Sequence, residues 1–131
     1  MNSEPRHRTT NETMSTVISQ YPGELDRDAV GIWQIVPGGK VDFGLSGDTL
    51  THYVRRAILA LLEAGAVPVK GGPDTGYFWI AQKQYGSTHN EIADAVIAEW
   101  RSVPDDPMML IGECAWFARP KFDNPNYVKL D

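Results

Sequence analysis

The clearest structural signal in the chain is residues 45–65, which read LSGDTLTHYVRRAILALLEAG. Ser46 can cap the start of a helix, and Asp48 places a negative charge in the first turn, where the helix dipole favours one. Gly65 suits the left-handed residue that commonly ends a helix. Between these signals, large apolar residues recur every three or four positions, as on the buried side of a helix. We therefore predict an amphipathic helix over residues 47–64, with the buried stripe Leu50, Tyr53, Val54, Ala57, Ile58, Leu61 and Leu62.

A second helix is predicted to begin at Thr88. Thr88 and Glu91 have the three-residue spacing of a capping box, in which each side chain accepts a hydrogen bond from the other residue's backbone N–H. Apolar residues then recur at helical spacing as far as Val103, and the proline-containing stretch 104–107 ends the helix.

Four strands are predicted around these helices. Runs rich in β-branched and aromatic residues cover residues 29–36, 66–70 and 77–85, and residues 108–118 are apolar enough for a strand buried on both faces. The order strand, helix, strand, strand, helix, strand predicts an α+β two-layer sandwich, in which a ferredoxin-like antiparallel sheet carries two helices on one face. The alternative is another mixed α+β sheet to which residues 40–43 add a hairpin.

A chain of 131 residues fits one domain. All the predicted helices and strands lie within residues 29–119, which we expect to form that domain. Residues 1–28 are predicted to be a flexible polar arm, and residues 120–131 an irregular tail. The only anchors we expect in the arm are the apolar residues of one short helix or strand, Met14, Val17, Ile18 and Tyr21.

Composition and charge exclude several classes of protein. Twelve Lys and Arg residues oppose seventeen Asp and Glu residues, and the formal net charge of -5 argues against binding nucleic acid. The longest apolar run, residues 57–62, is far shorter than a membrane span. Without a signal-peptide pattern or a cysteine partner for a disulfide, the chain is expected to be cytoplasmic.

Motifs that could carry catalysis are weak. Residues 42–44 read Asp-Phe-Gly, as in the metal-binding tripeptide of protein kinases, but the other kinase motifs are missing. Residues 71–76 lack the Lys-Ser/Thr pair of a phosphate-binding loop. Cys114 lies in an apolar run and is expected to be buried, and His52 and His89 do not have metal-ligand spacing. We therefore expect no catalytic residue, no metal site and no cofactor.

Glu113 is a charged residue within the most apolar stretch of the chain. Three environments are open to it: solvent at a sheet edge, an ion pair with Arg55 or Arg56, or a pocket between helices and sheet. A pocket containing Glu113 and an arginine, together with Trp79 and Tyr85, would indicate a small-molecule binder or an enzyme, which is the alternative function.

The aromatic residues of the predicted strands suggest a binding surface. Helices cover only one face of the predicted sheet, so some of these rings could form an interaction surface on the other face. Protein interfaces favour Trp and Tyr over charged residues. We therefore expect a protein that docks or neutralises a protein partner, or that associates with a second copy of itself. The residues predicted to form the surface are Trp33, Tyr77, Trp79, Tyr85 and Trp116.

Overall fold

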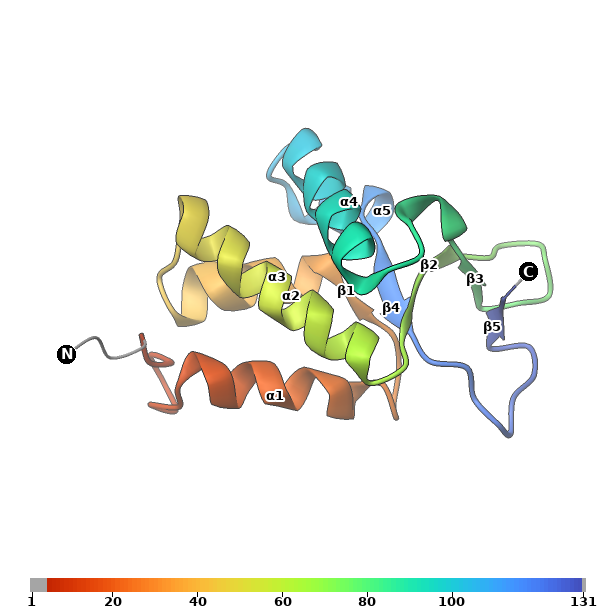
Figure 1. Ribbon diagram of the computed structural model, residues 1–131, viewed down its shortest axis with the longest axis horizontal. Coiled ribbons are helices and arrows are strands. Elements are labelled where there is room, and N and C mark those ends of the chain that lie inside the picture. The colour runs from red at the N-terminus through yellow and green to blue at the C-terminus, as the bar shows by residue number, and fades with distance from the viewer. Residues whose placement is uncertain (1–4, 131) are drawn as a thin grey trace.

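A computed structural model describes residues 5–130 of the protein (Figure 1). The helices are α1 (Met14–Glu24), α2 (Ile32–Pro37), α3 (Gly47–Glu63), α4 (His89–Ser102) and α5 (Pro107–Glu113). The strands are β1 (Val30–Gly31), β2 (Val67–Gly71), β3 (Trp79–Ala81), β4 (Trp116–Ala118) and β5 (Val128–Lys129). A π-helical segment, η1 (Gly38–Asp42), continues α2, and a 3-10 turn, η2 (Lys83–Tyr85), follows β3.

Helix α3 lies between α1 and α4 at the centre of the helical layer (Figure 1). The prediction of this helix is confirmed, and all seven residues of its predicted stripe are buried. The prediction for the start of α4 is also confirmed. The Glu91 backbone N–H donates to the Thr88 hydroxyl at 3.1 Å, and the Thr88 N–H donates to the Glu91 carboxylate at 2.9 Å.

Helix α1 packs along α3 and contributes to the main core. Thr13 caps its start by accepting a hydrogen bond from the Thr16 backbone N–H, and Met14 and Ile18 are buried against the rest of the protein. Of the short helix or strand expected in the N-terminal segment, the structure has the helix, α1. Residues 1–4 of the predicted arm lie outside the described residues.

The five strands form one mixed sheet in the order β1-β4-β2-β3-β5. Neighbouring strands are antiparallel except for β3 and β5, which are parallel. The prediction of an α+β protein is confirmed, but the ferredoxin-like strand order is not. The alternative hairpin is wrong, because residues 40–43 lie mostly in η1. Residues 77–85 form a strand of only three residues before η2.

Part of the predicted first strand is a helix. Within residues 29–36, β1 has two residues and α2 begins at Ile32. Ile32, Ile35 and Val36 are each at most 1% exposed, and their spacing of three and four residues places them on one side of a helix. A helix therefore buries all three side chains in the main core, whereas a strand would turn Ile35 and Val36 to opposite faces.

Residues 108–118, predicted as one buried strand, divide into α5 and β4. The Asp106 carboxylate caps α5 by accepting a hydrogen bond from the Met108 backbone N–H at 2.8 Å. Pro107 follows in the first turn, where a helix needs no N–H donor. The stretch 104–107, interpreted as the end of one helix, therefore also starts the next.

The two faces of the sheet contribute to different cores. Phe117 points from β4 toward the helices and is 0% exposed in the main core. On the opposite face, Trp79 and Trp116 pack beside a smaller buried cluster to which the C-terminal segment contributes. The members of this cluster are Ala29, Val69, Ala118, Tyr127 and Val128. The segment predicted as an irregular tail thus supplies β5 and part of this cluster, while residue 131 lies outside the described residues.

Candidate functional site

Three of the five predicted surface aromatics form a continuous row of indoles. The ring centres of Trp33 and Trp116 are 6.1 Å apart, and those of Trp116 and Trp79 are 5.1 Å apart. All three side chains are partly exposed. A Cβ atom at Gly31 would come within 2.6 Å of the Trp33 ring and 2.9 Å of the Trp116 ring, so only glycine lets both indoles approach this strand. The three residues come from distant parts of the chain, since Trp33 lies on α2, Trp79 on β3 and Trp116 on β4.

The indoles of Trp33 on α2 and Trp116 on β4 differ in their hydrogen bonds. Trp116 Nε1 donates to the Ile111 carbonyl of α5 at 3.0 Å, which fixes that ring. Trp33 Nε1 is buried but has no acceptor among the described residues. A buried donor without a partner carries a desolvation cost, so the Trp33 ring is held by packing alone.

The two tyrosines of the predicted surface lie elsewhere. Tyr77 is partly exposed and has the Lys129 ammonium 5.8 Å from its ring centre. Tyr85 is only 7% exposed, and its hydroxyl donates to the Glu99 carboxylate of α4 at 2.8 Å. The prediction for Tyr85 is therefore wrong, because η2 turns this side chain inward to the partly buried Glu99 carboxylate.

The predicted pocket residues are separated by their own contacts. Arg55 pairs with Asp94 of α4, whereas Arg56 donates a hydrogen bond to Ser15 of α1. Glu113 is exposed at the end of α5. None of Arg55, Arg56 and Glu113 lines the hollows described below, and the two arginines bind partners on different helices.

A polar cluster that sequence reasoning missed surrounds Cys114. The Glu99 carboxylate, besides accepting from Tyr85, lies 3.3 Å from the Lys70 ammonium, which also donates to the Glu113 carbonyl at 2.8 Å. Cys114 is 0% exposed, and burial is the main cause that raises the pKa of its thiol to about 11. A protonated, inaccessible thiol is a poor nucleophile, so the cluster joins β2, α4 and α5 rather than assembling a reactive site.

A shallow groove with a largely apolar lining lies between α2 and α5. Its hollow of about 480 Å³ is lined by Trp33, Pro37, Val41 and Pro107, among others. A smaller hollow of about 200 Å³ continues it past Val41 and Pro107. Val41 is 63% exposed, and Met108, next to Pro107, is 73% exposed. We call this feature the α2–α5 groove.

Acidic side chains border the α2–α5 groove. Asp42 lines the larger hollow and Asp105 the smaller one, while Asp106 lies between Asp105 and Pro107 in the sequence. Lys40 pairs with Asp105, and His7 Nε2 lies 3.3 Å from the Asp42 carboxylate. Two carboxylates and one lysine thus line the groove.

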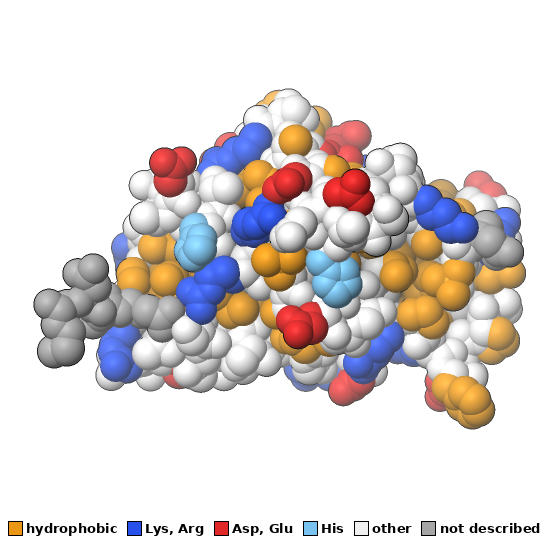
Figure 2. Space-filling model, in the orientation of Figure 1, with side chains coloured by type: hydrophobic (Ala, Val, Ile, Leu, Met, Phe, Trp, Pro, Cys, Tyr) orange, Lys and Arg blue, Asp and Glu red, His pale blue; other side chains and the backbone are white. Residues whose placement is uncertain are grey.

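Charged and apolar groups are distributed differently on the face shown in Figure 2. Acidic and basic side chains alternate over α3 and α4, as on an ordinary solvated surface. Apolar side chains gather at the end that carries β3 and β5, where Phe78 is 65% exposed and Leu130 is 47% exposed.

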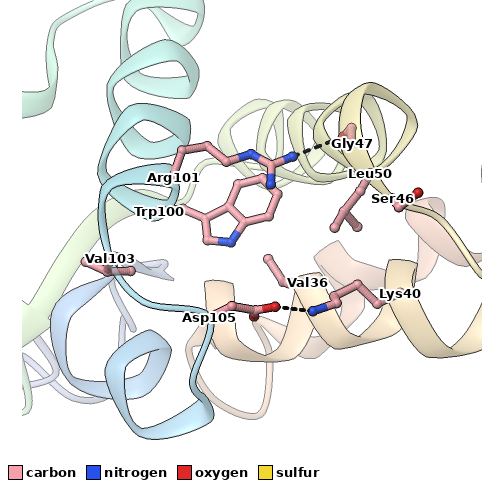
Figure 3. A pocket seen from close by; sticks show the side chains of 9 residues that line it. All are labelled: Val36, Lys40, Ser46, Gly47, Leu50, Trp100, Arg101, Val103 and Asp105. Atoms are coloured by element: carbon pink, nitrogen blue, oxygen red, sulfur yellow. Dashed lines mark hydrogen bonds and ion pairs between the residues drawn. The ribbon is translucent and has the colours of Figure 1, made fainter.

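A third hollow lies between α2–η1, the start of α3 and the end of α4 (Figure 3). Its volume is about 350 Å³, and Val36, Leu50 and Trp100 supply its apolar lining. Arg101 and the Lys40–Asp105 ion pair supply the charges. We call it the Trp100 cavity.

Comparison of the chain with protein families, with curated proteins and with solved structures finds no match. Within residues 5–130, the longest helices are too short or too polar to cross a lipid bilayer. The same residues contain no group of three or more His, Cys, Asp and Glu side chains arranged to hold a metal ion.

Proposed function

We propose that this protein binds a protein partner through the α2–α5 groove. The observation that carries the proposal is the exposure of Val41 and Met108 beside a hollow lined by Trp33, Pro37 and Pro107. Covering an apolar side chain of this size contributes up to about 1.5–3 kcal/mol. Interfaces concentrate their binding energy in such apolar and aromatic centres.

The acidic rim indicates the chemistry of the partner. Asp42 and Asp105 line the groove, and the whole chain has a net charge of -5. A segment with apolar side chains flanked by Lys or Arg would fill the hollow and neutralise the rim. A second copy of the chain is a poorer occupant, because a symmetric dimer through this groove would bring two acidic rims together.

The indole row provides a rigid wall for the same surface. Trp33 lines the groove and packs on Trp116, which in turn packs on Trp79. A pre-organised aromatic wall lowers the entropy cost of binding, because its side chains are ordered before the partner arrives. Trp33 therefore connects the predicted aromatic surface to the groove.

The proposal is tested by selecting peptides from a random phage-displayed library on the full chain. The double variant Val41→Glu/Met108→Glu removes the apolar surface, and the glutamate introduced at position 108 lies in the first turn of α5, where a negative charge is tolerated. Phe122→Glu is the matched control, because Phe122 is fully exposed on the loop before β5. We expect peptides rich in Lys, Arg and large apolar residues that bind the wild type and the control but not the double variant.

Two results would contradict the proposal. Selected peptides that bind the double variant as well as the wild type would show that the groove is not the docking site. Sedimentation that shows a stable dimer of the wild type, and monomers of the double variant, would show that a second copy occupies the groove.

A further inference from the structure

The Trp100 cavity combines charged side chains at its mouth with the apolar side chains Val36, Leu50 and Trp100, which are each at most 5% exposed, and sites for small ligands also combine apolar and polar groups (Figure 3). Val36 from α2 and Leu50 from α3 face the Trp100 indole of α4. A volume of about 350 Å³ is at the small end of the range for ligand sites. The occupant must therefore be small, with an apolar part that can lie against the indole.

Arg101 is held in place at this cavity without a carboxylate partner. Its guanidinium carbon lies 3.9 Å from the centre of the Trp100 ring, and Nη2 donates to the Gly47 carbonyl at 3.0 Å and to the Thr51 hydroxyl. Among residues 5–130, these are the hydrogen bonds that the guanidinium makes, so Nε and Nη1 can still donate to a ligand. A fixed guanidinium loses little entropy when it binds an anion.

Lys40 already binds a carboxylate at the same cavity. Its ammonium pairs with Asp105, and both side chains are partly exposed to solvent. Exposed ion pairs contribute about 0–1 kcal/mol, so another carboxylate can replace Asp105 at small cost. With two cations and one carboxylate, the charged lining of the cavity has an excess positive charge.

We infer that the Trp100 cavity binds a small organic carboxylate with a planar apolar body. The body lies against Trp100, Val36 and Leu50, and the carboxylate accepts hydrogen bonds from Arg101 and Lys40. Asp105 then competes with the ligand for Lys40. This site does not rest on the proposed protein-binding function, because Trp100 and Arg101 do not line the α2–α5 groove, although Lys40 and Asp105 line both.

The test is a titration of the ¹⁵N-labelled full chain with 3-phenylpropionate, followed by NMR. Trp100→Phe assigns the Trp100 indole N–H among the four indole signals. The uncharged 3-phenylpropanamide has the same apolar body and serves as the ligand control. We expect a saturable shift of the Trp100 signal with the carboxylate, and binding of the amide that is weaker by about tenfold, because charge-assisted hydrogen bonds are lost.

Three variants separate this site from non-specific binding. Arg101→Gln should weaken binding of 3-phenylpropionate by about tenfold, whereas Asp105→Asn should tighten it by about twofold to fivefold, because the competing carboxylate is removed. Arg55→Gln is the matched control and should bind as the wild type does, since Arg55 pairs with Asp94 outside the cavity.

Equal affinities for the carboxylate and the amide would overturn the inference, and this comparison needs no variant to fold. Wild-type affinity in Arg101→Gln, or an unmoved Trp100 signal at millimolar ligand, would overturn it as well. Val41→Glu/Met108→Glu should bind 3-phenylpropionate normally, so failure of the peptide selection and failure of this titration are distinguishable.

Discussion

The contact between α1 and α3 can be tested through two tyrosine hydroxyls. Tyr21 of α1 and Tyr53 of α3 lie with their hydroxyl oxygens 2.8 Å apart. Tyr53 is 0% exposed, whereas Tyr21 is partly exposed and lines a surface hollow. Burial raises the pKa of both groups above the usual value for tyrosine, so both remain neutral near pH 7. Tyr→Phe at either position removes one hydroxyl and little else.

The expected costs of the two substitutions differ. A hydrogen bond contributes about 0.5–1.5 kcal/mol net, and a buried group left without a partner costs about 1–3 kcal/mol. Tyr21→Phe leaves the buried Tyr53 hydroxyl without this partner, and should lower the free energy of unfolding by about 2 kcal/mol. Tyr53→Phe leaves the hydroxyl of the partly exposed Tyr21 without this partner, and should cost about 1 kcal/mol. The double variant should cost about 1–2 kcal/mol, less than the sum.

Urea unfolding followed by circular dichroism measures these differences, provided that all variants keep the same m-value. Tyr77→Phe is a suitable control, because Tyr77 is partly exposed in the loop before β3 and the substitution should change stability by less than about 0.5 kcal/mol. If the losses in unfolding free energy of the two single variants simply add in the double variant, the two hydroxyls do not stabilise each other through a hydrogen bond. A loss below about 0.5 kcal/mol for Tyr21→Phe would refute the docking of α1 on α3.

Two further predictions concern the main core. Leu61→Ala should lower the free energy of unfolding by about 2–5 kcal/mol, because Leu61 is 0% exposed on α3, and urea denaturation that shows almost no change would contradict this packing. Burial raises the pKa of the Cys114 thiol from 9.0 to about 11. Proton binding to this thiol therefore stabilises the folded protein fully below pH 9, and this stabilisation is lost as the pH rises toward 11. The Cys114→Ala variant should lack this part of the alkaline destabilisation. In the native protein, Cys114 should react with a thiol reagent much more slowly than after unfolding. Equal reaction rates in the native and unfolded protein would contradict the burial of Cys114.

The elements that could be predicted from the sequence are those with local start signals and a single apolar stripe. Helix α3 has both, and its predicted end differs from the observed one by one residue. Helix α4 begins at the Thr88 capping box as predicted. In both helices the information lies within one segment, because capping and i, i+3, i+4 spacing depend on neighbouring residues only.

The short helices α2 and α5 could not be distinguished from strands by composition. A run of four to eight apolar residues is compatible with a buried strand or a buried helix. For α2, tertiary packing decides, because three large side chains on one helical side reach the main core. For α5, Asp106 and Pro107 are a helix start signal, but from the sequence alone residues 104–107 are interpreted only as the end of the preceding helix.

The candidate sites depend on contacts between segments that are distant in the chain. The sequence predicted Trp33, Trp79 and Trp116 as part of an aromatic surface, and in the structure their rings form one row. The α2–α5 groove and the Trp100 cavity were not predicted. Both contain residues from η1 and from the connection between α4 and α5, whose positions no local pattern determines.

The ion pair between Lys40 and Asp105 lines both the Trp100 cavity and the α2–α5 groove, which predicts coupling between the two proposed ligands. A carboxylate bound to Lys40 releases Asp105, so the groove rim gains one unpaired negative charge. A basic peptide selected on the groove should therefore bind more tightly when 3-phenylpropionate is present, and by reciprocity the peptide should tighten binding of 3-phenylpropionate by the same factor. Fluorescence anisotropy of a labelled peptide measures this change, for which we expect about twofold to fivefold in low salt. Asp105→Asn should remove the coupling while leaving both sites occupied, whereas unchanged coupling in this variant would show that Asp105 does not connect the sites.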